Sequence, residues 1–317
     1  MKQFFYFFIG LLSFSAVSQG NWYAEQIVVQ QGLKKHTLMG ANQLIEEKIA
    51  SLPQAQFWKQ IMQLSPDSCL INVASSRYIL KKMSIKDWHK QSEQEKTAFK
   101  DSLKATHHLQ SSERIFVTTG KNDFYRFHAV YPSISEGIKA FEANQVDPWY
   151  AQAILLIESP GQLKKSSVGA YGAFQLMPGV ARAMGLTVNR SVDERKDFKR
   201  SAYAASRLIK TICIPEAKKI LERHQIAYRE QDLWFRLFVL HVYHAGALNV
   251  AAVIQKIQPN TGSMDIIKSM WQNTAASFGN NSQNYTQLAL AAQLIINEMV
   301  FQWCDEIYEQ PILQGSL

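Results

Sequence analysis

One acidic residue stands at the end of an apolar run, where a helix must stop. Residues 153–157 (AILLI) are all apolar, Glu158 follows, and Ser159-Pro160-Gly161 end a predicted helix that begins near Pro148. The negative end of the helix dipole and the apolar neighbours both raise the carboxyl pKa, as a general acid near neutral pH requires. A single glutamate more often turns to solvent, so this pattern alone leaves both interpretations open.

A loop punctuated by glycines follows the acid. Residues 166–178 read SSVGAYGAFQLMP and lead into a predicted helix that starts at Pro178. Gly169 and Gly172 would permit close approach of the backbone to a ligand, and Gln175 offers a planar amide for polar recognition. A plain turn before a helix would account for the glycines alone.

Taken together, these residues resemble a known enzyme family. Glu158-Ser159, Ser166, Gly169-Ala170, Gly172, Gln175 and Met177-Pro178 are similar to the motif of lytic transglycosylases, the lysozyme-like enzymes that cleave bacterial peptidoglycan. Residues 192–197 (VDERKD), followed by an alanine-rich stretch, look like the membrane-bound murein transglycosylase D branch. The resemblance covers roughly residues 135–300, and none is found for residues 20–130.

Two further family motifs occur downstream. The family's A-Y-N-x-G motif is replaced by residues 242–246 (VYHAG), so that His244 stands where the family has asparagine. A late tyrosine of the family is matched by Asn284-Tyr285. A neutral imidazole at His244 could still hydrogen-bond, whereas a charged one would favour an ionised Glu158.

The resemblance implies a single-glutamate mechanism. Glu158 would protonate the glycosidic oxygen between N-acetylmuramic acid and N-acetylglucosamine, and the substrate's N-acetyl group would stabilise the developing cation. The Glu158 carboxylate would then deprotonate the muramyl C6 hydroxyl, which attacks C1 to leave a 1,6-anhydromuramyl end. Ser166 would hydrogen-bond near the acid or the N-acetyl group. The resemblance implies substrate binding by Ser166, Gly169, Tyr171, Gln175, Met177, Tyr243, His244 and Tyr285. It implies neither a cofactor nor a metal.

Three other interpretations stay open. Asp193 or Glu194 could activate water as a second carboxylate, as in a goose-type-lysozyme-like hydrolase, although both also suit a loop that caps the helix after Asp197. A non-catalytic wall-binding protein could keep the same fold, and His244 favours that alternative. His241 and His244 share a helix face, but two histidines without a third ligand favour a packed pair over a metal site.

Composition and charge limit the partners. The 317 residues are 47% hydrophobic and 19% charged, which is typical of a globular chain of one or two domains. The net charge of +8 favours anionic surroundings such as cell-wall polymer. Because the basic residues are spread along the chain, nucleic acid is the weakest candidate, and peptidoglycan glycan strands are the expected partner.

The first residues predict export. Lys2, an apolar run from Phe4 to Phe14 and small residues at 16–18 are typical of a signal peptide over residues 1–18. The run is short for a membrane anchor, so we expect no transmembrane span in the mature chain and a location in the periplasm or cell envelope. Cys69, Cys213 and Cys304 permit one disulfide in that compartment, and whether Cys213 and Cys304 pair is left open.

The chain is predicted to be mainly α-helical. We expect a mostly helical N-terminal domain of unknown role over residues 19–130, which positions the catalytic domain or binds other cell-envelope proteins, and a lysozyme-like catalytic domain over residues 131–317. Predicted helices are Lys34–Leu52, Gln54–Leu64 and Glu93–His107, and predicted strands are Ser68–Val73 and Arg114–Val117. The 22-residue apolar run Leu233–Ile254 predicts one core helix, because Arg236, His241, His244 and Asn249 would be costly in lipid.

Overall fold

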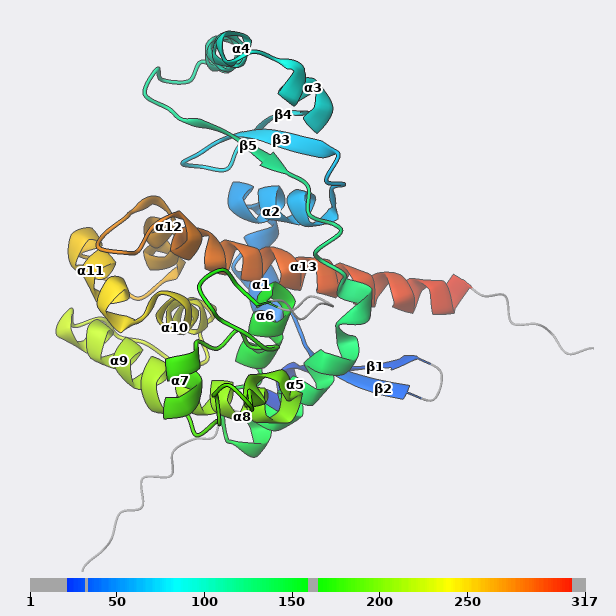
Figure 1. The fold of residues 1–317 in the computed structure, drawn as a ribbon, viewed down its shortest axis with the longest axis vertical. Coiled ribbons are helices and arrows are strands. Elements are labelled where there is room, and N and C mark those ends of the chain that lie inside the picture. The colour runs from blue at the N-terminus through cyan, green and yellow to red at the C-terminus, as the bar shows by residue number, and fades with distance from the viewer. Residues whose placement is uncertain (1–21, 32–33, 159–164, 310–317) are drawn as a thin grey trace, which may run out of the picture.

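The computed structural model describes residues 22–31, 34–158 and 165–309, and its fold is mainly helical, as predicted, with two small sheets in the N-terminal part (Figure 1). The predicted signal peptide, residues 1–18, lies outside the described residues. No helix in the described part of the chain combines the length and the apolar character needed to cross a bilayer.

The chain enters through a short helical turn and a β-hairpin. The turn η1 (Trp22–Glu25) leads into strand β1 (Gln26–Gln31), which pairs antiparallel with β2 (Lys34–Met39). The predicted helix Lys34–Leu52 is therefore wrong in its first third, and only α1 (Asn42–Glu46) and η2 (Ile49–Ser51) are helical. Residues 34–39 form a strand instead of a helix because their backbone groups hydrogen-bond to distant partners. The strand pairs with β1, and the amide and carbonyl of Met39 both bond to the Gln152 side chain.

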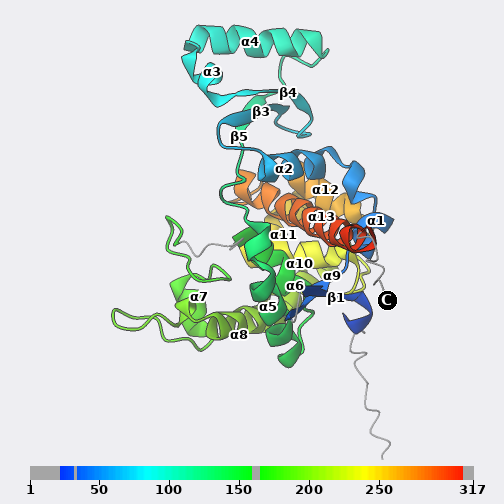
Figure 2. The same cartoon turned by 90° about the vertical axis from the view of Figure 1, so that its right-hand side faces the viewer.

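A small sheet module, residues 68–119, follows helix α2 (Pro53–Gln63). Strand β3 (Ser68–Val73) forms where predicted and lies between the edge strands β4 (Ile79–Ser84) and β5 (Ile115–Thr119). Helices α3 (Ile85–Lys90) and α4 (Glu93–Thr106) cover one face of this sheet, and α2 covers the other (Figures 1 and 2). The start of α4 is set by a capping box between Ser92 and Glu95.

The C-terminal half is a helical assembly around a buried helix. Helix α6 (Trp149–Glu158) is buried from Trp149 to Ile157 and packs against α5 and α13, because it is apolar on every side. The other elements are η3 (Phe127–Ala129), α5 (Tyr131–Ala143), α7 (Pro178–Ala183), η4 (Glu194–Lys196), α8 (Phe198–Leu208), η5 (Ile209–Cys213), α9 (Ile214–Arg223), α10 (Leu233–Ala245), α11 (Ala247–Ile257), α12 (Met264–Gln272) and α13 (Asn280–Glu309).

The apolar run Leu233–Ile254 is two helices, so the prediction of one continuous helix is wrong. The break between α10 and α11 lies at Gly246, whose φ of 80° and ψ of 151° are accessible to glycine alone at low cost. The turn redirects the chain directly after Tyr243 and His244, so it ends the helix that carries both side chains.

One core spans most of the molecule. It joins Leu38, Phe57 and Ile61 from the first part of the chain to Phe141 and Ile154 from the helical half. A second, smaller cluster of Cys69, Ile71, Trp88, Leu103 and Ile115 lies inside the sheet module. Cys213 is also a buried thiol, and the side chain of Cys304 lies outside the described part of the chain.

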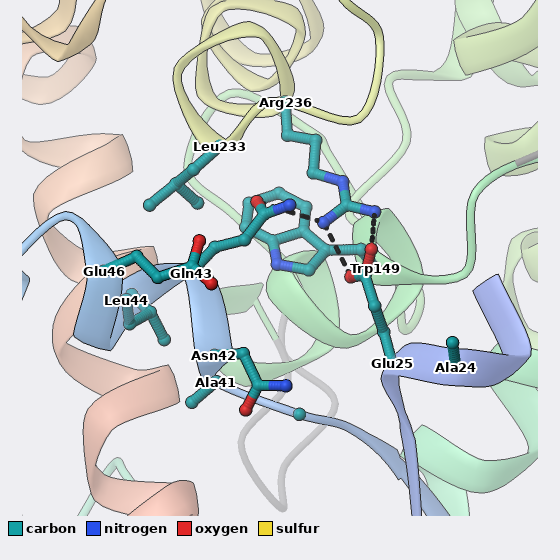
Figure 3. Close-up of a pocket in the computed structure, with 11 residues that line it drawn as sticks. Ala24, Glu25, Ala41, Asn42, Gln43, Leu44, Glu46, Trp149, Leu233 and Arg236 are labelled. Carbon is teal, nitrogen blue, oxygen red and sulfur yellow. Dashed lines mark hydrogen bonds and ion pairs between the residues drawn. The ribbon is translucent and has the colours of Figure 1, made fainter. Parts of the chain in front are cut away.

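A buried arginine connects three segments behind α6. The Arg236 guanidinium on α10 donates to Asp147 at 2.7 Å. It also donates to Glu25 at 2.8 and 3.1 Å and lies over the Trp149 ring (Figure 3). Asp147 also accepts the backbone amide of Trp149 at 2.9 Å. The cluster therefore fixes the beginning of the helix that ends in Glu158.

Candidate active site

Glu158 is the last residue of α6 and is half-buried. Burial raises the pKa of its carboxyl to about 7 from an ordinary 4.5, while a contact with the Tyr285 hydroxyl acts in the opposite direction and is the smaller effect. The pKa rise expected from the apolar neighbours is therefore confirmed. Residues 159–164, with the predicted helix stop Ser159-Pro160-Gly161, lie outside the described residues.

Three tyrosines from distant parts of the chain surround this carboxyl. Tyr125 precedes α5, Tyr243 lies on α10 and Tyr285 lies on α13, and the pKa of each is raised by burial and, secondarily, by the nearby Glu158 charge. The Tyr243 hydroxyl donates to the Phe174 carbonyl at 2.6 Å. Within the described residues no cation acts on the pKa of Glu158, and the tyrosines around it are neutral. The site therefore favours the protonated acid up to about neutral pH.

The Tyr285 hydroxyl is available to this carboxyl. It is buried and makes no hydrogen bond that meets the usual distance and angle in the described structure, yet it lies close enough to lower the pKa of Glu158. Such long or poorly aligned contacts are common at catalytic groups without substrate. Tyr285 is thus the side chain best placed to stabilise the ionised form of Glu158.

His244 lies beside the same tyrosine. Its ring stacks on Tyr285, with centroids 4.2 Å apart and planes at 16°. Burial lowers the pKa of His244, although solvent moderates this effect because more than a third of the residue is exposed. The imidazole is therefore neutral near pH 7 and able to hydrogen-bond, as the family asparagine would.

His241 faces a different environment. It is fully buried, its Nε2 lies 3.0 Å from the Thr286 hydroxyl, and that hydroxyl also accepts from the Trp271 indole at 2.8 Å. Burial lowers the pKa of His241 to about 3, so it is neutral. Within the described ranges no three histidine, cysteine or acidic side chains gather as a metal site would require.

The glycine loop is held by contacts within the loop and by the neighbouring segment that contains Arg195. The Ser166 hydroxyl accepts from the Ala170 amide at 2.8 Å, and Gly169 takes a φ of 93°. Gly172 has a φ of 86°, and a side-chain carbon there would lie 2.0 Å from the Arg195 carbonyl oxygen. Gly172 is therefore required for packing within the chain, which differs from the predicted role of admitting a ligand.

Arg195 organises this loop and was missed by the sequence analysis. It is buried, and its Nη1 donates to the carbonyls of Gly169 at 2.8 Å and Leu176 at 2.9 Å. Tyr171 lies under its guanidinium and bridges Leu176 through the backbone. Arg195 lies two residues after Asp193, with which it pairs, and this spacing alone does not indicate a role in the loop.

Gln175 and Met177 occupy the end of the loop. The Gln175 amide donates to the Gly172 carbonyl at 3.0 Å and so supports the turn. Met177 precedes α7 and is 41% exposed, which leaves its thioether accessible to a ligand. Ser166, Gly169 and Gln175 thus shape the loop through contacts of their own, whereas Met177 presents its side chain outward.

Asp193 and Glu194 are committed to arginines. Asp193 pairs with Arg195 at 2.7 Å, and Glu194 pairs with Arg200 at 3.1 Å and accepts the Thr187 amide. These contacts lower the pKa of both acids, and neither acts on the pKa of Glu158. Asp197 caps α8, so this acidic segment has the structural roles that the sequence analysis gave as the alternative to activating water.

Comparison with known proteins identifies the segment that contains the acid. Residues 137–266 match the family model described as the transglycosylase SLT domain. No curated protein and no solved structure matches the chain. The match supports the general assignment of this segment to the lytic transglycosylases of the lysozyme-like superfamily, which act on peptidoglycan. It includes Glu158 and Tyr243, while Tyr125 and Tyr285 lie outside it.

Proposed function

We propose, from the transglycosylase match over residues 137–266, that this protein cleaves peptidoglycan with Glu158 as its single acid and base and leaves 1,6-anhydromuramyl ends. The observation that carries the proposal is the half-buried carboxyl, whose pKa is raised to about 7 and which has no ionic partner in the described residues. A pKa near the working pH suits a group that must give a proton and then accept one.

The reaction begins with a protonated Glu158. The acid donates its proton to the glycosidic oxygen between N-acetylmuramic acid and N-acetylglucosamine, and the bond from that oxygen to muramyl C1 breaks. The C6 hydroxyl oxygen then bonds to C1, and its proton passes to the Glu158 carboxylate. The acid is restored and no water is consumed.

The surrounding side chains support both halves of this cycle. Neutral tyrosines and a neutral His244 leave the first proton on Glu158, because no nearby cation among the described groups favours its ionisation. Once the proton has left, the Tyr285 hydroxyl stabilises the carboxylate, which agrees with its lowering effect on the pKa. Tyr171, Tyr243 and His244 offer rings that suit sugar faces.

The arginine pairs of Asp193 and Glu194 favour this route over hydrolysis, since a water-activating base needs an accessible carboxylate near the acid. We further propose that the protein is exported to the periplasm or cell envelope, where its substrate lies, and that residues 19–130 act there with the catalytic part. Its membership of the transglycosylase D branch stays a proposal on the motif of residues 192–197.

The test is the mass of the released product. Purified wild-type protein incubated with peptidoglycan is expected to release muropeptides that lack one water, and Glu158→Gln is expected to release none. Glu194→Gln is the matched control and should keep the anhydro product, because its carboxylate serves Arg200. Ordinary reducing ends that vanish in Glu194→Gln would establish hydrolysis, and release unchanged in Glu158→Gln would remove Glu158 from the mechanism.

A further inference from the structure

Besides Arg195 and Arg236, a third arginine, Arg77, is buried in the described part of the chain. It occupies the turn between β3 and β4 with a φ of 62° and is 6% exposed. No carboxylate pairs with it in the described part of the chain, and burial lowers its pKa. A buried cation without an acid and a left-handed backbone are both unfavourable, so the contacts of Arg77 must offset these costs.

Those contacts are aromatic rings and two amides. The guanidinium carbon lies 5.6 Å from the ring centroid of Phe57, 5.7 Å from that of Trp58 and 5.5 Å from that of Phe116. Its Nη2 donates to the side-chain oxygens of Asn284 at 2.8 Å and Asn280 at 3.1 Å. Both asparagines belong to the first turns of α13, so Arg77 connects the small sheet module to that helix.

Helix α2 reinforces the same attachment. The Trp58 indole donates to the Gln287 side chain at 3.0 Å. Residues 280, 284 and 287 follow the i, i+4, i+7 spacing of one helix face, and α2 lies along α13 in both views of the fold (Figures 1 and 2). One face of the start of α13 is therefore held by Arg77 and Trp58.

The other side of α13 is held from within the helical half. Thr286 bonds to Trp271 and His241, and it lies about 200° around the helix from Asn284. Tyr285 lies between these two attachments, stacks on His244 and presents its hydroxyl to Glu158. The rotation of α13 about its axis, and with it the aim of Tyr285, depends on both attachments.

We propose that Arg77 is a positioning residue of the active site: through Asn280 and Asn284 it fixes the rotation of α13 that aims the Tyr285 hydroxyl at Glu158. The inference rests on the proposed function, since it assigns a role in that same reaction. It extends the working site beyond residues 137–266, because Arg77 and Tyr285 both lie outside the matched segment.

The test is the pH profile of product release. The titratable groups that act on Glu158 in the described structure are Tyr125, Tyr243 and Tyr285, with His244 stacked behind Tyr285. Since the Tyr285 contact lowers the pKa of Glu158, Tyr285→Phe should move the alkaline limb of kcat/KM upward by about one pH unit. Arg77→Met should move it in the same direction, and in the Tyr285→Phe background it should add nothing.

Lys59→Met is the matched control. Lys59 joins α2 to Glu298, on the same pair of helices but 13 positions beyond Tyr285. The Lys59→Met substitution should lower the midpoint temperature of thermal unfolding without moving the alkaline limb of the kcat/KM profile. Asn284→Ala, a milder loss of the same contact, should shift the limb as Arg77→Met does, and it replaces Arg77→Met if that variant does not fold.

The outcomes separate the two proposals. If Arg77→Met and Asn284→Ala lower stability but leave the alkaline limb where it is, Arg77 is only structural and the inference is overturned. The inference is also overturned if the pH shift of the double variant equals the sum of the shifts of Arg77→Met and Tyr285→Phe. If Glu158→Gln retains full product release, the proposed function fails whatever the Arg77 variants do.

Discussion

At Glu158, the surroundings that suit a general acid also disfavour the ionised folded state. The carboxyl has a pKa of about 7 in the folded protein and an ordinary value of 4.5 once the chain unfolds. Between those values the folded state binds more protons than the unfolded state, so stability falls as the pH rises through this window. Above pH 7 the full loss of folding stability is present, and this loss disappears when Glu158 is replaced by a residue with a neutral amide.

The first prediction follows at this residue. Glu158→Gln should be more stable than the wild type at pH 8 by about 1–3 kcal/mol, and nearly equal to it at pH 4, below the ordinary pKa of the acid. Thermal unfolding at the two pH values measures the difference, which corresponds to a few degrees for a chain of this size. Glu194→Gln should show no such gain, because the contacts of Glu194 lower its pKa. A gain of the same size at both pH values would contradict the argument.

At the scale of the element, the glycine loop is stabilised by packing against the segment that begins at Asp193. Arg195 binds two loop carbonyls, and its own carbonyl occupies the space where a side chain at residue 172 would lie. Gly169 has a similar positive φ, but a side-chain carbon there would meet no atom within 4 Å. Substitution of Gly169 therefore measures the cost of backbone strain alone, whereas substitution of Gly172 measures that cost together with steric overlap.

This comparison gives a second prediction. Gly169→Ala should cost about 1 kcal/mol from the left-handed backbone alone. Gly172→Ala should cost about 3 kcal/mol or more, since the loop must also move away from the Arg195 carbonyl. Urea denaturation of both variants measures the difference. Equal losses would show that the contact with Arg195 does not constrain the loop.

At the scale of the whole molecule, the Arg236 cluster connects the entry of the chain to the helix of the acid. Arg236 is fully buried, and its two carboxylate partners, Glu25 and Asp147, come from segments more than a hundred residues apart. Burial raises the pKa of Asp147, and the attraction of Arg236 opposes that rise. Without Arg236 the carboxylates would be left without their cation, which is costly mainly where they are ionised.

The third prediction therefore concerns Arg236→Met. We expect a loss of about 3–5 kcal/mol near pH 7, and a smaller loss near pH 4, where Asp147, whose pKa is raised by burial, can take up a proton. Arg229→Met is the control, because Arg229 forms an exposed pair with Asp232 and its loss should change stability by about 0.5 kcal/mol or less. Denaturant unfolding at both pH values checks this, and a loss that does not depend on pH would count against it.

Local order in the sequence was enough to predict several elements and the apolar surroundings of Glu158, while the family resemblance singled out Glu158 as the candidate acid. Glu158 follows five apolar residues, and this arrangement already implied its raised pKa; α2, β3 and α4 also form close to their predicted bounds. Such features depend on neighbours within a few positions, and the sequence states those directly. Tyr243 and Tyr285 were predicted from the family resemblance. Their neighbours in the sequence give no indication that the two side chains lie at the site.

Contacts between distant residues required the folded chain. Tyr125 joins the site from the connection before α5, and Arg77 reaches Asn284 across more than two hundred positions. Residues 34–39 form a strand because β1 and Gln152 take their backbone hydrogen bonds, and Gly172 is required because Arg195 packs against it. The local sequence, together with the family resemblance, thus indicated Glu158 as the candidate acid. The packing of remote segments determined which hydroxyls face it, because those contacts form only when the chain is folded.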